Sequence, residues 1–249
     1  MDNLQVMDGL SSRLLASQCY ADKTNSIPNK LLFQVDLAPG ETRTFYIMEP
    51  SPFVAVPPPI VKTFARYVPE RYDDFAWESD RIAHRIYGLA LIPAEGTVSS
   101  GADVWIKKDR GLIVDTMYAT KHYHEDNGSF MDDYRVGKSR GCGGLGIWDG
   151  KQLHVSSNWK NWKLITTGPI RSEFELTYEP WDAGNGRMVS EVKPEKTSGA
   201  SIGTINGVGA GGAAGAAAAT SCPSDSVGEA GSAMRAKSLS GVCASAGRD

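Results

Sequence analysis

The stretch KLLFQVDLAPGETRTFYIM, residues 30–48, decides the fold class of this chain. Its first half, residues 30–37, is an apolar run of the length of a buried strand. Its second half, residues 38–48, begins with a Pro-Gly turn and then alternates polar and apolar side chains. The stretch therefore predicts two strands joined as a β-hairpin.

Further short apolar runs follow along the chain, separated by Gly or Pro, and each predicts a strand. They are GADVWIKK (101–108), GLIVDTMY (111–118), KQLHVSS (151–157), WKLITTG (162–168) and IRSEFELTYEPW (170–181). The proline-rich segment 51–61 is better interpreted as an extended linker or an edge strand. Strands at this spacing indicate an all-β protein, an antiparallel β-sandwich.

The segment AWESDRIAHRIYGLAL (76–91) fits both a helix and a strand, and its β-rich surroundings favour a strand. In either conformation, residues four apart point to the same side. We therefore expect Arg81 and Arg85 to share a face.

The composition divides the chain at about residue 197. Residues 1–197 carry all the aromatic residues and predict the β-sandwich domain, whereas residues 198–249 are rich in Gly, Ala and Ser and predict a disordered tail. The net charge of −3 lacks the basic excess that nucleic acid binding requires. No stretch reaches the roughly 18 continuous apolar residues of a membrane helix, so we expect neither a nucleic acid partner nor a membrane span.

The segment KHYHEDNGSF (121–130) concentrates titratable groups, including two of the four histidines of the chain. In an extended conformation, His122 and His124 face one side and Tyr123 faces the other. The cluster can be a catalytic site, a polar loop, or a divalent metal site at His122 and His124 with Glu125 or Asp126 as a further ligand. We expect no cofactor, and the metal is the minor alternative.

Basic, acidic and aromatic residues elsewhere could complete a binding site. The planar guanidinium groups of Arg81, Arg85 and Arg140 suit a carboxylated substrate. The motif SNWKNWK places Trp159 and Trp162 among polar residues, which predicts a partly exposed platform for a sugar ring.

Four blocks of the chain resemble a known protein family. They are KLLFQVDLAPGETRTFYI, RYVPERYDDFAWESDRIAHRIYG, YHEDNGSFMDDYRVGKSRGCGGLGIWDG and GPIRSEFELTYEPW. Together they resemble, over about residues 4–193, a family of bacterial polysaccharide-utilisation proteins, formerly of unknown function, that includes the oligosaccharide dehydratases of ulvan breakdown. Members of that family are longer, so we expect the chain to be truncated and its sandwich incomplete.

The resemblance implies a periplasmic or secreted lyase that eliminates water from a terminal uronic acid of an oligosaccharide. It gives each candidate residue a role. An arginine pair, Arg81 with Arg85 or Arg140, would neutralise the substrate carboxylate. His124 would take the C5 proton, and Tyr123 or Tyr134 would act as the acid. The remaining candidates would bind the sugar (His122, Trp159, Trp162) or orient the arginines and histidine (Glu78, Asp80, Asp126).

Two other functions remain open from the sequence. One is a non-catalytic β-sandwich that binds acidic glycans through its tryptophans and arginines. The other is a glycoside hydrolase, which needs two carboxyl groups about 5–10 Å apart. Glu78 and Asp126 are the candidates for that pair.

Overall fold

The computed structural model describes most of the first 189 residues. These are residues 4–21, 27–53, 57–120, 124–126, 128–132, 136, 141–144, 146–184 and 186–189, together with the backbone of strands Val192–Ser198, Gly228–Ala230 and Cys243–Gly247. The described residues form mostly strands, arranged in several antiparallel sheets, with little helix. This confirms the all-β class.

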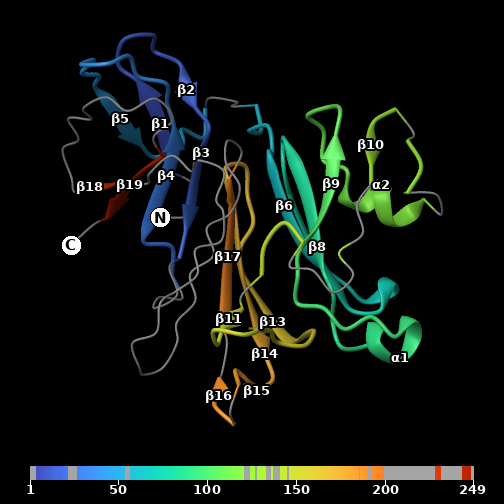
Figure 1. Ribbon diagram of the computed structural model, residues 1–249. Coiled ribbons are helices and arrows are strands. Elements are labelled where there is room, and N and C mark those ends of the chain that lie inside the picture. Colours follow the sequence, from blue (N-terminus) through green and yellow to red (C-terminus); the bar gives the residue numbers. More distant parts are fainter. Residues whose placement is uncertain are drawn as a thin grey trace.

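A five-stranded antiparallel sheet lies on the right of Figure 1 and is called the central sheet here, because it is covered on both faces. Its strands, in spatial order, are β10 (Phe130–Met131), β9 (Asp103–Lys107), β8 (Ile82–Ile86), β7 (Asp74–Ser79) and β6 (Thr63–Val68). All six residues of β7 are buried, so this strand is covered on both faces. The ambiguous segment 76–91 thus contributes to two strands with a turn between them, and Arg81 lies in that turn.

A second sheet packs on one face of the central sheet and completes a sandwich. It consists of β13 (Trp159–Thr166), β14 (Arg171–Tyr178) and β17 (Val192–Ser198). Phe75, Trp77 and Ile86 of the central sheet form one core cluster with Phe174 and Leu176 of β14. These are the alternate, inward-facing residues of their strands, as expected for a sandwich core.

The other face of the central sheet is covered by helix α2 (Val114–Ala119), which lies beside β9 and β10 in Figure 1. The prediction of a strand at residues 111–118 is therefore wrong. The carboxylate of Glu78 accepts the backbone N–H groups of Ile113 at 2.8 Å and Val114 at 2.9 Å. This buried acid satisfies donors at the start of the helix, a tertiary contact that local apolar pattern does not reveal.

The N-terminal strands form two more sheets. One contains β2 (Leu14–Leu15), β1 (Gln5–Asp8) and β5 (Phe45–Met48), and the other contains β18 (Gly228–Ala230), β19 (Cys243–Gly247), β4 (Lys30–Gln34) and β3 (Ser17–Tyr20). The predicted hairpin is wrong in its pairing, because β4 and β5 belong to different sheets. Their side chains meet instead, with the rings of Phe33 and Phe45 5.1 Å apart. The connection between them, residues 35–44, is too long for a tight hairpin.

Short elements complete the described chain. They are the 3₁₀ turn η1 (Pro69–Arg71), helix α1 (Leu91–Glu95), the pair β11 (Ile147–Trp148) with β12 (Leu153–His154), and the pair β15 (Trp181–Asp182) with β16 (Met188–Val189). The proline-rich segment contains no strand at residues 51–53 and 57–61, where it is described. Most of the predicted disordered tail lies outside the described residues. Among the residues that the structure describes, no helix is long and apolar enough to cross a membrane.

Candidate functional site

Arg85 is the centre of a buried polar network on the helix-covered face of the central sheet. The alternation of β8 places Ala83 and Arg85 on this face and His84 and Ile86 on the sandwich face. The side chain of Arg85 is only 4% exposed. A charge buried this deeply requires partners of opposite sign.

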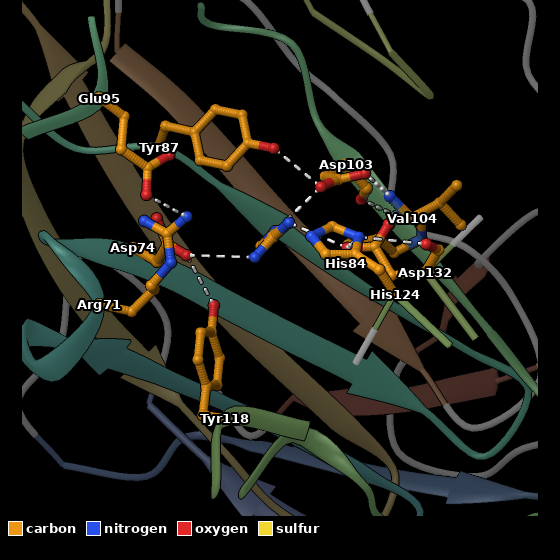
Figure 2. Close-up of polar contacts among 11 residues, drawn as sticks. Arg71, Asp74, His84, Tyr87, Glu95, Asp103, Val104, Tyr118, His124 and Asp132 are labelled. Carbon is orange, nitrogen blue, oxygen red and sulfur yellow. Dashed lines mark hydrogen bonds and ion pairs between the residues drawn. The ribbon is translucent and has the colours of Figure 1, made fainter. Parts of the chain in front are cut away.

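Three aspartates from different parts of the sheet surround the Arg85 guanidinium. Its Nε donates to Oδ2 of Asp103 on β9 at 2.9 Å, and its Nη2 donates to Oδ2 of Asp132, just after β10, at 3.0 Å. Its Nη1 lies 3.9 Å from Oδ2 of Asp74, the first residue of β7. Figure 2 shows Asp74 at one end of this network and Asp132 at the other.

Aromatic side chains enclose the network. The guanidinium of Arg85 lies over the rings of Trp105 and Tyr87, at 5.3 Å and 5.5 Å from their centroids. The hydroxyl of Tyr87 donates to Asp103 at 2.8 Å, and that of Tyr118, on α2, donates to Asp74 at 3.1 Å. Burial raises the pKa of both phenols, so both remain protonated donors.

Burial also changes the acidity of two of the aspartates. It raises the pKa of Asp74 to about 7, although the charges of Arg85 and Arg71 act in the opposite direction. Burial and the charge of Asp103 raise the pKa of Asp132, which the charge of Arg85 partly offsets. Within the described part of the chain, Oδ1 of Asp74 and Oδ1 of Asp132 are buried without a hydrogen-bond partner. Buried carboxyl groups with a raised pKa occur often at functional sites and also in structural ion-pair networks.

His124 connects the buried network to the surface. Its side chain is 65% exposed, and its Nδ1 lies 3.4 Å from Oδ2 and 3.3 Å from the backbone oxygen of Asp132 (Figure 2). The backbone oxygen of Asp132 is an acceptor, so the contact is a hydrogen bond when Nδ1 carries a proton. The contact with Asp132 fixes the position of the His124 ring at the surface.

The structure brings two of the predicted site residues together, Arg85 and His124, joined through Asp132. Arg81 does not join them. It is exposed in the turn before β8, about 13 Å along the strand from Arg85 at 3.3 Å per residue. The expectation that Arg81 and Arg85 form one substrate-binding pair is wrong, because Arg81 lies outside the strand and Arg85 is bonded to protein carboxylates.

The three acids expected to orient the arginines and histidine have other partners. Glu78 binds Lys107 at 2.7 Å and the start of α2. Asp80 binds Arg110 at 3.1 Å, and Asp126 binds Lys108 at 2.6 Å. None of these partners is Arg81, Arg85 or His124, and among the described residues Asp103 and Asp132 contact Arg85 or His124 instead. A contact of these three acids with Arg140 stays a prediction, because Arg140 lies outside the described residues.

The two tryptophans of SNWKNWK differ in exposure. Trp159 is 2% exposed in the sandwich core, where its Nε1 donates to the backbone oxygen of Ile86 at 3.2 Å. The expectation that Trp159 is partly exposed is therefore wrong. Trp162 is 43% exposed, as expected.

Four predicted site residues, His122, Tyr123, Tyr134 and Arg140, lie outside the described residues. Their roles stay predictions, as does the metal alternative at His122 and His124. Among the residues that are described, no group of three or more His, Cys, Asp or Glu side chains is placed to hold a metal ion.

Sequence reasoning missed Asp74, Asp103 and Asp132. The signal for Asp103 was available, since an acid on β9 opposite an arginine on β8 is a favourable cross-strand pair. Asp132 had a weaker signal as one of two acids that follow an apolar pair. Asp74 could not be recognised, because its partner Tyr118 is on a helix that was predicted as a strand.

A second histidine–aspartate pair lies on the hairpin of β11 and β12. Nε2 of His154 is 2.8 Å from Oδ2 of Asp149. Asp149 also accepts the backbone N–H groups of Lys151 and Gln152, and these bonds and His154 lower its pKa to about 2. A Cβ at Gly184 would lie 2.8 Å from Nε2 of His154, so this ring is packed against the neighbouring turn. The pair stabilises a turn and provides a comparison for His124.

Comparison with known proteins places the chain in a family. A family model described as "Domain of unknown function (DUF4861)" matches residues 1–197. The chain belongs to this family. A curated relative, "Uncharacterized protein P7" from Formosa agariphila, is 36% identical over 204 residues, which cover 77% of this chain and 51% of the relative. The chain therefore spans about half the length of that relative, and no solved structure matches it.

Proposed function

We propose that this protein is a carbohydrate-active carbon–oxygen lyase, an oligosaccharide dehydratase that removes water from a terminal uronic acid. The observation that carries the proposal is the connected series His124, Asp132 and Arg85. It presents an exposed imidazole at the surface and supports it with a buried carboxylate. The choice of a uronate-containing oligosaccharide as substrate rests on the resemblance of the four sequence blocks to the polysaccharide-utilisation family.

The chemistry requires a base for a weakly acidic C–H bond. The C5 proton of a uronate becomes removable when charge can pass into the adjacent carboxylate, and the hydroxyl at C4 then leaves as water after protonation. A positioned histidine contributes about 10²- to 10⁴-fold to such a step. Asp132 holds Nδ1 of His124, so it orients the ring and stabilises the imidazolium formed when Nε2 accepts the proton.

Arg85 has a different role in this proposal from the one expected from sequence. Its guanidinium is bonded to Asp103 and Asp132, so it holds the acid behind His124 instead of binding the substrate carboxylate. Neutralising the substrate falls to Arg140, and protonating the leaving hydroxyl falls to Tyr123 or Tyr134. These three assignments come from sequence alone.

Incubation with uronate-terminated oligosaccharides tests the proposal directly, because elimination alone creates a conjugated double bond that absorbs in the ultraviolet. We expect wild-type protein to produce this absorbance and His124→Ala to lower the rate about 10²- to 10⁴-fold. His154→Ala is the matched control, since it removes the other histidine–aspartate pair and should leave the rate unchanged. A His124→Ala variant with wild-type turnover would remove this residue from the mechanism.

The same assay separates the two other functions. Reducing ends released without absorbance would indicate a glycoside hydrolase, and binding without either product would indicate a non-catalytic glycan-binding domain. Glu78 and Asp126 were the candidate carboxyl pair for hydrolysis. Glu78 does not suit this role, because it is completely buried and bonded to Lys107 and to the start of α2. The exposed Trp162 favours glycan binding as the second candidate.

A further inference from the structure

Trp162, Tyr67 and Asp73 form a rim at the edge of the sandwich, away from His124. We propose that this rim is a second carbohydrate site, which binds one uncharged pyranose ring of a glycan chain. The choice of a glycan as ligand rests on the proposed function, whereas the geometry of the rim does not involve His124.

The indole of Trp162 is an exposed ring in a fixed orientation. It stacks on Tyr67 with centroids 5.3 Å apart and an interplanar angle of 25°, and it lies 5.8 Å from Phe75. These contacts hold one side of the indole, yet 43% of the residue stays exposed. Trp148 is 59% exposed but makes no ring contact among the described residues. An aromatic side chain that is solvent-exposed and already held in one orientation loses little conformational entropy when it stacks against a ligand.

Asp73 lies at the other end of Tyr67. The Tyr67 hydroxyl donates to Oδ1 of Asp73, which raises the pKa of the phenol to about 12. Within the described part of the chain, no second hydrogen bond is made to the Asp73 carboxylate. Its remaining oxygen is therefore available to accept a hydroxyl group of a ligand.

The backbone holds Asp73 in an unusual conformation. Tyr72 and Asp73 have φ of 50° and 61°, the left-handed region, which is uncommon for two consecutive non-glycine residues. The backbone of Asp73 also lies so close to Gly88 that a Cβ there would be 2.2 Å from the Asp73 backbone oxygen. Unfavourable conformations of this kind persist where the surrounding fold imposes them, and they cluster at binding sites.

The chemistry of the rim fits a neutral sugar. A pyranose ring has an apolar C–H face, which suits the indole, and hydroxyl groups, which suit a carboxylate acceptor. The charge of Asp73 repels a uronate carboxylate at the same place. Lys160, two residues before Trp162, is paired with Glu179. The rim therefore selects an uncharged residue of a mixed glycan.

The rim is separate from the proposed reaction site. Tyr67 is on β6 and faces the second sheet, whereas Asp132 follows β10 and faces α2. β6 and β10 are opposite edges of the five-stranded sheet, so four strand spacings, about 19 Å, lie between them. One sugar ring cannot reach both places, and a site at the rim would bind a distant part of the chain or a separate chain.

Electrophoresis of the native protein through gels that contain soluble xyloglucan, a polysaccharide of uncharged sugar rings, tests the rim. We expect the wild type to be retarded, and Trp162→Ala and Asp73→Asn each to weaken the apparent affinity about tenfold. Trp162→Phe should recover part of the retardation because it keeps an aromatic ring. Trp148→Ala is the matched control and should behave as wild type. Asparagine tolerates left-handed backbone, so Asp73→Asn should keep the fold, and the melting temperature of each variant checks this.

Each outcome decides for or against the rim. An unretarded wild type, or equal retardation of wild type, Trp162→Ala and Asp73→Asn, overturns it. If Trp162→Ala does not fold, loss of retardation in the folded Asp73→Asn variant supports the rim, and unchanged retardation overturns it. Retardation that depends on Trp162 in a protein that produces no ultraviolet absorbance would support the rim and refute the dehydratase. If the protein produces absorbance and Trp162→Ala does not change the retardation, the dehydratase is supported and the rim is refuted.

Discussion

Asp74→Asn should stabilise the protein at neutral pH, although it removes a buried charge close to an arginine. Asp74 is fully buried, and Nη1 of Arg85 is 3.9 Å from its Oδ2. That separation is too long for a hydrogen bond, so the arginine compensates only in part for the loss of solvation. Burial accordingly raises the pKa of Asp74 from 3.8 to about 7.

The sign and size of the stability difference between Asp74→Asn and wild type follow from the linkage between proton binding and folding. Between about pH 4 and pH 7 the folded protein keeps a proton on Asp74 that the unfolded chain has released, so the free energy of unfolding falls as the pH rises. A shift from 3.8 to about 7 corresponds to about 4 kcal/mol once the pH exceeds 7. Asparagine resembles the protonated acid, still accepts from Tyr118, and cannot ionise. We therefore expect equal stability near pH 4 and a variant more stable by up to about 4 kcal/mol near pH 8.

Urea denaturation of wild type and variant at about pH 4, 6 and 8 measures this difference. The comparison must be between the two proteins at each pH, because buried His84 changes the wild-type stability in the opposite direction. Asp115→Asn is the matched control. Its side chain is 71% exposed beside Arg66, so its effect should be below about 1 kcal/mol.

A variant that is less stable than wild type near pH 8 would refute this reasoning. It would mean that Asp74 is ionised in the folded protein and that its attraction to Arg85 outweighs the cost of burial. A difference that does not change with pH would refute it equally, because the effect would then come from packing and not from ionisation.

Three more predictions concern stability. Lys107→Met leaves the carboxylate of Glu78 buried without its cation and should cost about 3–5 kcal/mol in urea denaturation. Gly88→Ala places a Cβ 2.2 Å from the backbone oxygen of Asp73 and should cost about 3 kcal/mol or more, which a lowered melting temperature would record. His84 has a pKa lowered from 6.5 to about 4 by burial, so it contributes stability that is lost as the pH falls through this range. His84→Gln should remove that loss, about 3 kcal/mol, from the pH dependence of unfolding.

Each of these changes has a control in the same chain. Lys108→Met removes an exposed pair with Asp126 and should cost less than about 1 kcal/mol. Gly40→Ala has left-handed backbone but open space around the added Cβ, and should cost about 1–2 kcal/mol. The packing described would be contradicted if Lys107→Met and Lys108→Met lost the same free energy of unfolding. It would be contradicted equally if Gly88→Ala and Gly40→Ala did so. If the free energy of unfolding of His84→Gln still falls as the pH is lowered from 6.5 to about 4, the lowered pKa of His84 is contradicted.

The sequence predicts the strands of this protein better than their partners. Alternation and Gly or Pro boundaries are local, so β9, β13 and β14 were predicted close to their observed positions. Pairing depends on distant segments, and residues 30–48 therefore appeared to be one hairpin when they enter two sheets. Helix α2 escaped prediction for the same reason, because a carboxylate 35 residues earlier in the chain caps it.

The candidate site shows the same division. A histidine in a polar cluster and an arginine on a strand could be selected by residue type, and the structure joins His124 and Arg85. Their connection through Asp132 depends on strand register, which residue type does not encode. A register shift in β13 between Trp159 and Asn161 puts Trp159 and Trp162 on the same face, although residues three positions apart on a regular strand face opposite sides. Both indoles contact Tyr67 and Phe75, yet Trp159 is 2% exposed and Trp162 is 43% exposed, a difference that the motif alone does not predict.

The bonds of Arg85 have a consequence for folding. Its carboxylate partners lie 18 and 47 positions further along the chain, on β9 and beyond β10. In a partly folded molecule in which β10 has not yet joined the sheet, Arg85 can still bond to Asp103, but Asp132 is absent from both Arg85 and His124. In the proposed mechanism, His124 can therefore act as the base only after β10 has joined the sheet, and a molecule without this strand should have no dehydratase activity.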